Sequence, residues 1–341
     1  MYNNKLHFMS FFINKEEVKI VKEIKFLGVT FTPNLSFEKH YKNSLSKAKI
    51  AINNLIGLFC KAKMKNIRIH FQLFNSIVMN SMGYATPIWS MEKFNDFEKI
   101  QNIFIRKIFQ LEYNIPGSAL RLETHRFRIN TILIKRYLKF LLKIIKAEDI
   151  TTKLLFLLHH KSRETDLRRS WIIQLSKIVN KYGFSIKLFM DRNYDIEQYS
   201  KEIIHRVMEY SIIQDVEDIR KRENTSWYAT ILNYPVNNNY ILTNIAFNVK
   251  KFFIQIRLNK YGIIINDKYI DYTQSKCPNC TKNLSKIHIL CENCDEKDKL
   301  QRLQIGTLAK CTSELEMYKT LDRADDNTIY KLYNYVKQLI K

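Results

Sequence analysis

Residues that interrupt helices are rare in this chain. Its 341 residues include only 7 Gly and 5 Pro, the two residue types that most often end or kink a helix. Long helices are therefore favoured over most of the length. Hydrophobic residues make up 46 % of the chain, which is enough for a packed core and excludes wholesale disorder. We expect a mainly α fold.

Apolar residues recur at helical spacing between residues 37 and 150. Spacings of three and four residues place them on one face of each helix. Further helical patterns cover residues 199–210, 247–258 and 328–340. Four apolar stripes predict the helices of a compact basic bundle: Leu45, Ala48, Ile52, Leu55 and Phe59; Ile67, Phe71, Phe74, Val78 and Ser81; Phe97, Ile100, Phe104, Ile108 and Leu111; Ile134, Leu138, Leu141 and Ile145.

The first 36 residues predict β-structure instead. The segments 11–13 and 18–21 predict two strands on either side of a turn at residues 14–17, as in a β-hairpin. Ile24, Phe26 and Gly28 alternate with Lys25 and Leu27, and residues 29–31 continue this extended run. The turn-forming residues 32–34 end it. We expect a short N-terminal hairpin before the helices.

The chain carries a large excess of positive charge. Lys and Arg number 56 against 33 Asp and Glu, a formal net charge of +23, which favours a polyanionic partner such as nucleic acid. The first 150 residues hold 25 basic and 11 acidic residues. The bias towards Lys, 40 against 16 Arg, also fits A/T-rich coding sequence, so this second interpretation stays open. The candidate phosphate contacts lie outside the apolar stripes: Lys39, Lys42, Lys47, Lys49, Lys61, Lys63, Arg106 and Lys107.

The pattern of apolar residues and cysteines bears on the compartment. No uninterrupted apolar run reaches the ~18 residues of a spanning helix, so we expect no membrane. The apolar stretch 6–13 is short and no small-residue cleavage site follows it. Four of the 6 Cys cluster near the C-terminus, which is typical of a metal site in a reducing compartment. We expect an intracellular protein of the nucleus or cytoplasm, not a secreted one.

The strongest motif is a cluster of Cys and His. Cys277 and Cys280 are separated by two residues, and His288 follows after seven more. One tight turn can present two thiolates to Zn²⁺, and His with a further Cys would complete a tetrahedron. We favour Cys294 as the fourth ligand because the two-residue gap from His288 to Cys291 is short, but Cys291 stays an alternative. Four protein ligands indicate a structural zinc ion.

Other chemistry is not predicted. The sequence contains no HExxH, Gly-rich phosphate loop or G-x-S-x-G motif. Asp325 and Asp326 resemble half of a polymerase aspartate pair, but they immediately precede a helical pattern, where acidic residues favour the helix dipole. We interpret them as a helix start and predict no catalytic residue. Cys60 and Cys311 are expected to be ordinary core residues.

Several segments resemble the reverse transcriptases of non-LTR (LINE-type) retrotransposons from the late palm onward. The stretch INKEEVKIVKEIKFLGVTFTPNLSFEKH is similar to the end of the palm, and its Phe26, Leu27 and Gly28 match the primer grip. Residues 44–89 resemble the thumb, with Tyr84 and Trp89 at the Y-x4-W spacing of the family. Ala85 departs from the Gly that is usual there.

The resemblance continues towards the C-terminus. QNIFIRKIF and IPGSALRLE are similar to the segment beyond the thumb. The Cys/His cluster falls where the family carries a C-x2-C-x7-H-x4-C zinc knuckle, and the gap from His288 to Cys294 is one residue longer here. The remaining matched positions are Arg106, Lys107, Pro116, Leu120, Glu123 and Arg302.

The resemblance implies four parts and a partner. These are a palm-end hairpin over 1–36, a thumb and post-thumb bundle over 37–150, a helical linker region over 151–270, and a zinc knuckle with a C-terminal helix over 271–341. The family's catalytic carboxylates would precede residue 13. We therefore expect a C-terminal fragment that binds RNA, an RNA–DNA hybrid or target DNA and is inactive alone.

Two alternatives remain open. The chain could be part of an active enzyme that upstream sequence or a separate N-terminal polymerase half completes, and only that full-length enzyme would use Mg²⁺. It could also be a helical, zinc-containing interaction module whose charge reflects codon bias.

Overall fold

The chain is mainly helical, as expected. The computed structural model describes residues 11–34, 36–89, 94–150, 152, 171–191, 193–222, 240–259, 261–265, 268–290 and 314–339. Within these ranges the helices are long and the few strands form small two-stranded hairpins. None of the described helices combines the length and apolar character that a bilayer crossing requires.

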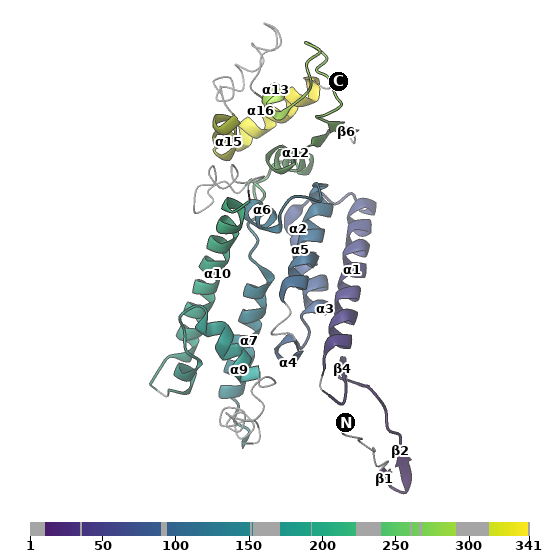
Figure 1. Cartoon of the computed structure of the whole chain (residues 1–341), viewed down its shortest axis with the longest axis vertical. Coiled ribbons are helices and arrows are strands. Elements are labelled where there is room, and N and C mark those ends of the chain that lie inside the picture. The colour runs from purple at the N-terminus through teal and green to yellow at the C-terminus, as the bar shows by residue number, and fades with distance from the viewer. Residues whose placement is uncertain are drawn as a thin grey trace, which may run out of the picture.

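Four long helices form the body of the molecule. They are α1 (Glu38–Lys61), α5 (Phe94–Phe109), α7 (Ile129–Ile145) and α10 (Ile196–Arg220), and they run along its long axis (Figure 1). Helix α5 packs against α1, α7 and the short α6 (Gly117–Glu123), while α10 packs on α6 and α7. Helices on both sides of residue 150 therefore share one bundle.

Most of the predicted stripes are buried. In α1, Ala48, Ile52, Leu55 and Phe59 face the core, and every predicted residue of the α5 stripe is buried. The fourth stripe is buried up to Leu141. Hydrophobic periodicity thus predicted the core-facing sides of these helices, because each side follows from local helix geometry.

The prediction for the second stripe was wrong at its last residue, Ser81. Helix α2 (Ile67–Leu73) continues through a π-helical segment (Phe74–Met79) into α3 (Asn80–Met82). A π-helical turn takes more residues than an α-helical one, so it rotates the residues that follow. Ser81 is consequently exposed, and Met82 takes its place in the core.

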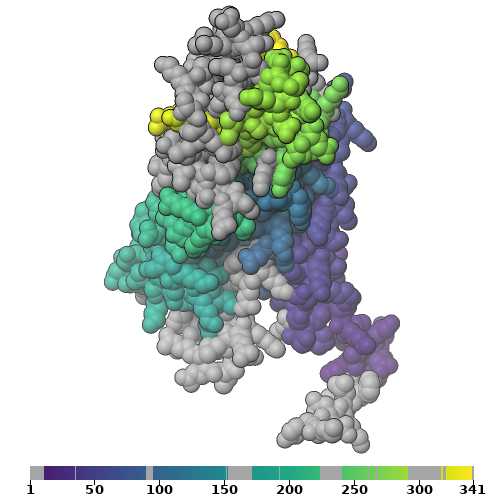
Figure 2. All heavy atoms as spheres, turned by 45° about the horizontal axis from the view of Figure 1, so that its top comes forward, coloured from purple at the N-terminus to yellow at the C-terminus, as the bar shows by residue number. Residues whose placement is uncertain are grey.

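A second group of elements covers one end of the bundle. Helix α12 (Phe247–Leu258) packs against α5, against the hairpin of β5 (Gly262–Ile265) and against α16 (Asp326–Leu339). Figure 2 shows the green segment of this group beside the end of the blue and purple helices.

Shorter elements complete the bundle and the second group. They are β6 (Lys268–Asp271), α4 (Thr86–Trp89), α9 (Trp171–Asn180), a 3₁₀ helix (Ile186–Met190), α13 (Lys286–Leu290) and α15 (Glu314–Asp322).

The N-terminal β-structure consists of two hairpins, not one hairpin with a continuous run. Strand β1 (Phe11–Ile13) pairs with β2 (Glu16–Val18), and β3 (Ile24–Phe26) pairs with β4 (Val29–Phe31). The extended run expected over residues 24–31 is thus broken in its middle by a tight turn. The β1–β2 hairpin projects away from the bundle (Figure 1), whereas β4 packs against α1 and buries Val29 in the core.

Candidate metal centre and basic helix face

A narrow loop brings the first two predicted metal ligands together. The Ser275 carbonyl accepts from the Leu284 amide (2.9 Å), and the Cys277 amide donates to the Lys282 carbonyl (2.8 Å). These bonds close the loop around the sequence C-P-N-C. Thr281 ends the turn in the left-handed region at φ 60°, and its amide donates to the Cys277 carbonyl (3.0 Å). The backbone therefore holds both thiols on one side of the loop.

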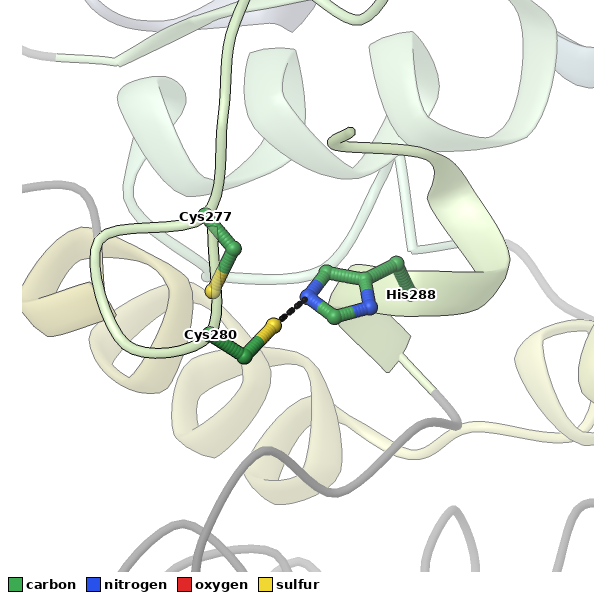
Figure 3. Close-up of side chains that lie close together, drawn as sticks. All are labelled: Cys277, Cys280 and His288. Atoms are coloured by element: carbon green, nitrogen blue, oxygen red, sulfur yellow. Dashed lines mark hydrogen bonds between the residues drawn. The ribbon is translucent and has the colours of Figure 1, made fainter. Parts of the chain in front are cut away.

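Helix α13 supplies the third ligand. The Ser285 hydroxyl accepts from the amide of His288 (2.9 Å), as an N-cap does. The imidazole then points at the two thiols (Figure 3). His288 and Cys277 are buried and Cys280 is partly buried.

The three side chains have the spacing of a tetrahedral metal site. Their ligand atoms lie within 4.8 Å of one another, and Cys280 Sγ lies 3.4 Å from His288 Nε2. Zn–S and Zn–N bonds of about 2.3 and 2.0 Å give an S···N edge of roughly 3.6 Å in a tetrahedron. The cluster could therefore hold a metal ion.

The other cysteines fall into two groups. Both candidates for a fourth ligand, Cys291 and Cys294, lie outside the described residues, as do Arg302 and Cys311. Cys60, which we expected in the core, is exposed. It follows Phe59, the last residue of the buried α1 stripe, so its side chain leaves the helix on a different side.

The lysines of α1 share its exposed side. The apolar stripe occupies the opposite side of the helix, and the single acidic residue of α1 is Glu38. All of these lysines are exposed. We call them the α1 lysine face: Lys39, Lys42, Lys47, Lys49 and Lys61.

Carboxylates neutralise only part of this face. Lys39 pairs with Glu23 (2.5 Å) and Lys42 pairs with Glu38 (3.6 Å). Among the residues that the structure describes, no ion pair reaches the other three lysines of the face. Lys63 is also exposed and follows the helix at φ 46°. The result is an exposed cationic strip along the outer side of the bundle.

The two basic residues of α5 make contacts within the protein. Arg106 is half-buried, and its Nη2 donates to the Ile115 carbonyl (2.5 Å). Burial lowers the pKa of its guanidinium. Lys107 is exposed, and its Nζ donates to Asn53 Oδ1 of α1 (2.6 Å). Arg106 thus fixes the loop after α5, while Lys107 joins two helices.

The predicted primer-grip residues form the tip of the β3–β4 hairpin. Phe26 and Leu27 are exposed. Leu27 (φ 44°) and Gly28 (φ 83°) are the two turn residues, and two positive φ values are typical of the tight turns that join β-strands. A Cβ on Gly28 would lie 3.3 Å from the Tyr84 ring. Gly28 thus serves the turn and a close contact with residue 84.

The acidic pair near the C-terminus begins a helix, as we interpreted it. Asp325 Oδ1 accepts a hydrogen bond from the Thr328 amide (2.8 Å) at the start of α16. Hydrogen bonds from Thr328 lower the pKa of Asp325. These contacts give Asp325 a capping role, and Asp326 is the first residue of α16.

Sequence patterns missed the buried ion pairs. Arg121 and Asp215 are both buried, and Arg257 pairs with the buried Glu123 (2.7 Å). These residues are charged, so the spacing of apolar residues could not predict that they are buried or which residues they contact. In the sequence, their position next to apolar residues was an indication that they could be buried.

Comparisons of the chain with family models, with curated proteins and with solved structures find no match.

Proposed function

We propose that the chain binds nucleic acid as the thumb and zinc-knuckle part of a non-LTR retrotransposon reverse transcriptase. The observation that carries the proposal is the α1 lysine face, where three of the five lysines have no carboxylate partner among the described residues. Cations in this arrangement attract the phosphates of RNA, an RNA–DNA hybrid or target DNA and release their counterions.

A zinc ion would complete the second part of this function. Cys277, Cys280 and His288 would hold it, with Cys294 as the favoured fourth ligand and Cys291 as the alternative. Four protein ligands leave no position for a reactive water, so the ion would be structural. It would fix the loop and α13 relative to each other at the end of the bundle.

Two details near the end of the thumb segment support the resemblance. Ala85 has φ 51°, a conformation that favours glycine, and glycine is the usual residue there in the family. Trp89 is buried and its Nε1 donates to the Tyr84 carbonyl (2.9 Å). The Y-x4-W spacing therefore has a structural reason in this chain.

The proposal is tested by the salt dependence of RNA binding. Anisotropy of a labelled single-stranded RNA would be measured with the full chain between 50 and ~300 mM salt. The triple variant Lys47→Gln, Lys49→Gln, Lys61→Gln should bind more weakly. Its slope of log affinity against log salt should be shallower by about 2, because each lost contact with a single strand contributes ~0.7.

A matched variant separates the face from net charge. Lys177→Gln, Lys187→Gln, Lys201→Gln removes the same charge from exposed positions on other elements and should leave the slope unchanged. Equal effects of the two triple variants, or binding that ignores salt, would refute the proposal. Zinc binding without RNA binding would favour the interaction module instead.

Metal analysis tests the zinc site separately. The purified chain should contain one zinc ion, Cys277→Ser should lose it, and Cys60→Ser should keep it. Comparison of Cys294→Ser with Cys291→Ser identifies the fourth ligand. A wild-type chain without zinc would contradict this part of the proposal. Primer extension by the chain alone would contradict the predicted inactivity.

A further inference from the structure

A groove of about 620 Å³ lies on another side of the bundle. Its walls come from the α2–π–α3 segment, from the start of α7 with the preceding loop, and from α10. Its volume is within the range of small-molecule sites. No acidic residue is among the described residues that line it.

Three cations line this groove, and the side chains that accept hydrogen bonds from its two arginines there are amides, not carboxylates. Arg126 Nη2 donates to Asn75 Oδ1 (2.8 Å), and Arg136 Nη2 donates to Asn80 Oδ1 (2.9 Å). Lys135 lies beside them and is exposed. Within the described part of the chain, none of the three cations forms an ion pair.

Three arginines elsewhere in the core have carboxylate partners, whereas the half-buried Arg106 donates to a backbone carbonyl. Arg121, Arg128 and Arg257 each contact a carboxylate oxygen at 2.6–2.7 Å. A buried or half-buried cation is stable when a counter-charge compensates it. The arginines of the groove have amides where the others have carboxylates, so an anion from outside would supply the missing compensation.

Arg126 is also held in place. Its guanidinium lies over the Phe71 ring, 5.0 Å from the centroid, and its Nε donates to Gln101 Oε1 (3.3 Å). Burial lowers its pKa to about 10, against a smaller opposing effect of Glu98. That carboxylate is already engaged by Arg121 (3.3 Å) and by the amide of Ile129. The Arg126 guanidinium is therefore held in a fixed position, and no carboxylate forms an ion pair with it among the described residues.

The π-helical segment shapes the wall of the groove. Asn75, Ser76 and Met79 belong to it and line the groove. A π-helical insertion is uncommon and is frequent at functional sites. Asn75 of this segment and Asn80, the first residue of α3, accept the hydrogen bonds from Arg126 and Arg136.

We propose that this groove binds a nucleoside phosphate, with the phosphate at Lys135, Arg126 and Arg136. Apolar side chains from three elements, Met79, Ile132 and Met208, line the same space and suit the flat face of a base. The amide of Gln72, which also lines the groove, suits the hydrogen-bonding edge of the base. This site is separate from the α1 lysine face and goes beyond the function proposed above.

Calorimetric titration of the full chain with AMP and with inorganic phosphate tests the site. AMP should bind at least 10-fold more tightly than phosphate, because base contacts add to phosphate contacts. Lys135→Glu and Arg136→Gln should each weaken AMP binding by about 10-fold or more, the effect of losing one charged hydrogen bond. The exposed position of Lys135 makes Lys135→Glu compatible with folding, and thermal melting checks this.

The control variants isolate the groove. Lys177→Glu makes the same charge change on an exposed helical position outside it and should change AMP affinity less than two-fold. The triple glutamine variant of the α1 lysine face should also leave AMP binding unchanged. Equal affinity for AMP and phosphate, no saturable AMP binding, or equal effects of Lys135→Glu and Lys177→Glu would overturn the proposal.

A competition experiment identifies the source of the nucleotide. An unlabelled oligothymidylate that displaces AMP, with displacement lost in Lys135→Glu, assigns the groove to a nucleic-acid strand. An oligothymidylate that leaves AMP bound assigns it to a free nucleotide. Both results support the nucleoside-phosphate site and differ only in what delivers the ligand.

Discussion

Ala85 holds a backbone conformation that its side chain disfavours. Its φ is 51°, in the left-handed region where a Cβ approaches the following carbonyl. The residue belongs to the turn between α3 and α4, and the Tyr84 carbonyl just before it accepts from Trp89 Nε1 (2.9 Å). The buried Trp89 thus helps to keep the strained turn in place.

Ala85→Gly should raise the free energy of unfolding by about 0.5–1 kcal/mol, because glycine removes the strain but adds entropy to the unfolded chain. Urea denaturation measures the change. Ala51→Gly, in the interior of α1, should lower the same free energy by about 1 kcal/mol. A loss of stability in both variants would show that Ala85 is not strained.

At the scale of elements, buried charges join α6, α7 and α10. Arg121 of α6 binds Asp215 of α10 through two hydrogen bonds (2.6 and 2.8 Å). Arg128, before α7, binds Asp215 as well (2.7 Å) and reaches the more exposed Asp218 (2.6 Å). One carboxylate therefore compensates two guanidinium groups in the interface between these helices.

Asp215→Asn should lower the free energy of unfolding by about 3 kcal/mol, because Arg121 and Arg128 lose the buried carboxylate that they share and keep only Glu98 and the half-exposed Asp218. Chemical denaturation monitored by circular dichroism would report the loss. Asp218→Asn removes a carboxylate that is about half exposed (49 %), and its effect should stay below about 1 kcal/mol. Similar losses in both variants would argue against a special role of the buried pair.

For the whole molecule, Arg257 connects three distant parts of the chain. It lies on α12 and binds Glu123 of α6 (2.7 Å) and Asp322 of α15 (3.1 Å). Tyr240 adds a hydrogen bond to the same Glu123 (2.5 Å). All of these side chains are buried, so the bundle and the C-terminal elements share one polar junction.

Arg257→Met should loosen both sides of this junction together. Amide hydrogen exchange in α6 and in α15 should accelerate, and overall stability should fall by about 3 kcal/mol, because the buried carboxylates of Glu123 and Asp322 both lose the guanidinium of Arg257. Arg206→Met removes an exposed arginine that pairs with Glu209 (3.7 Å) and should leave exchange in both helices unchanged. Faster exchange in only one of α6 and α15 would mean that the junction does not couple them.

The sequence by itself determined the helical class, most core-facing sides and the Cys277, Cys280 and His288 cluster that could hold a metal ion. Each depends on short-range geometry. Helix periodicity puts Ala48 and Ile52 on one side of α1, and a two-residue gap in a tight turn puts Cys277 beside Cys280. The α1 lysines could be placed on the exposed side for the same reason.

Only the tertiary structure decided the features that join remote segments. Arg121 and Asp215 are 94 residues apart, and Glu123 and Arg257 are 134 residues apart. No local periodicity encodes such pairs, because partners of a buried charge are selected when helices pack. The π-helical segment is also not encoded by a regular helical period, and it moves Ser81 out of the core. The groove at Arg126 likewise arises where three elements meet, so its residue types carry no pattern along the chain.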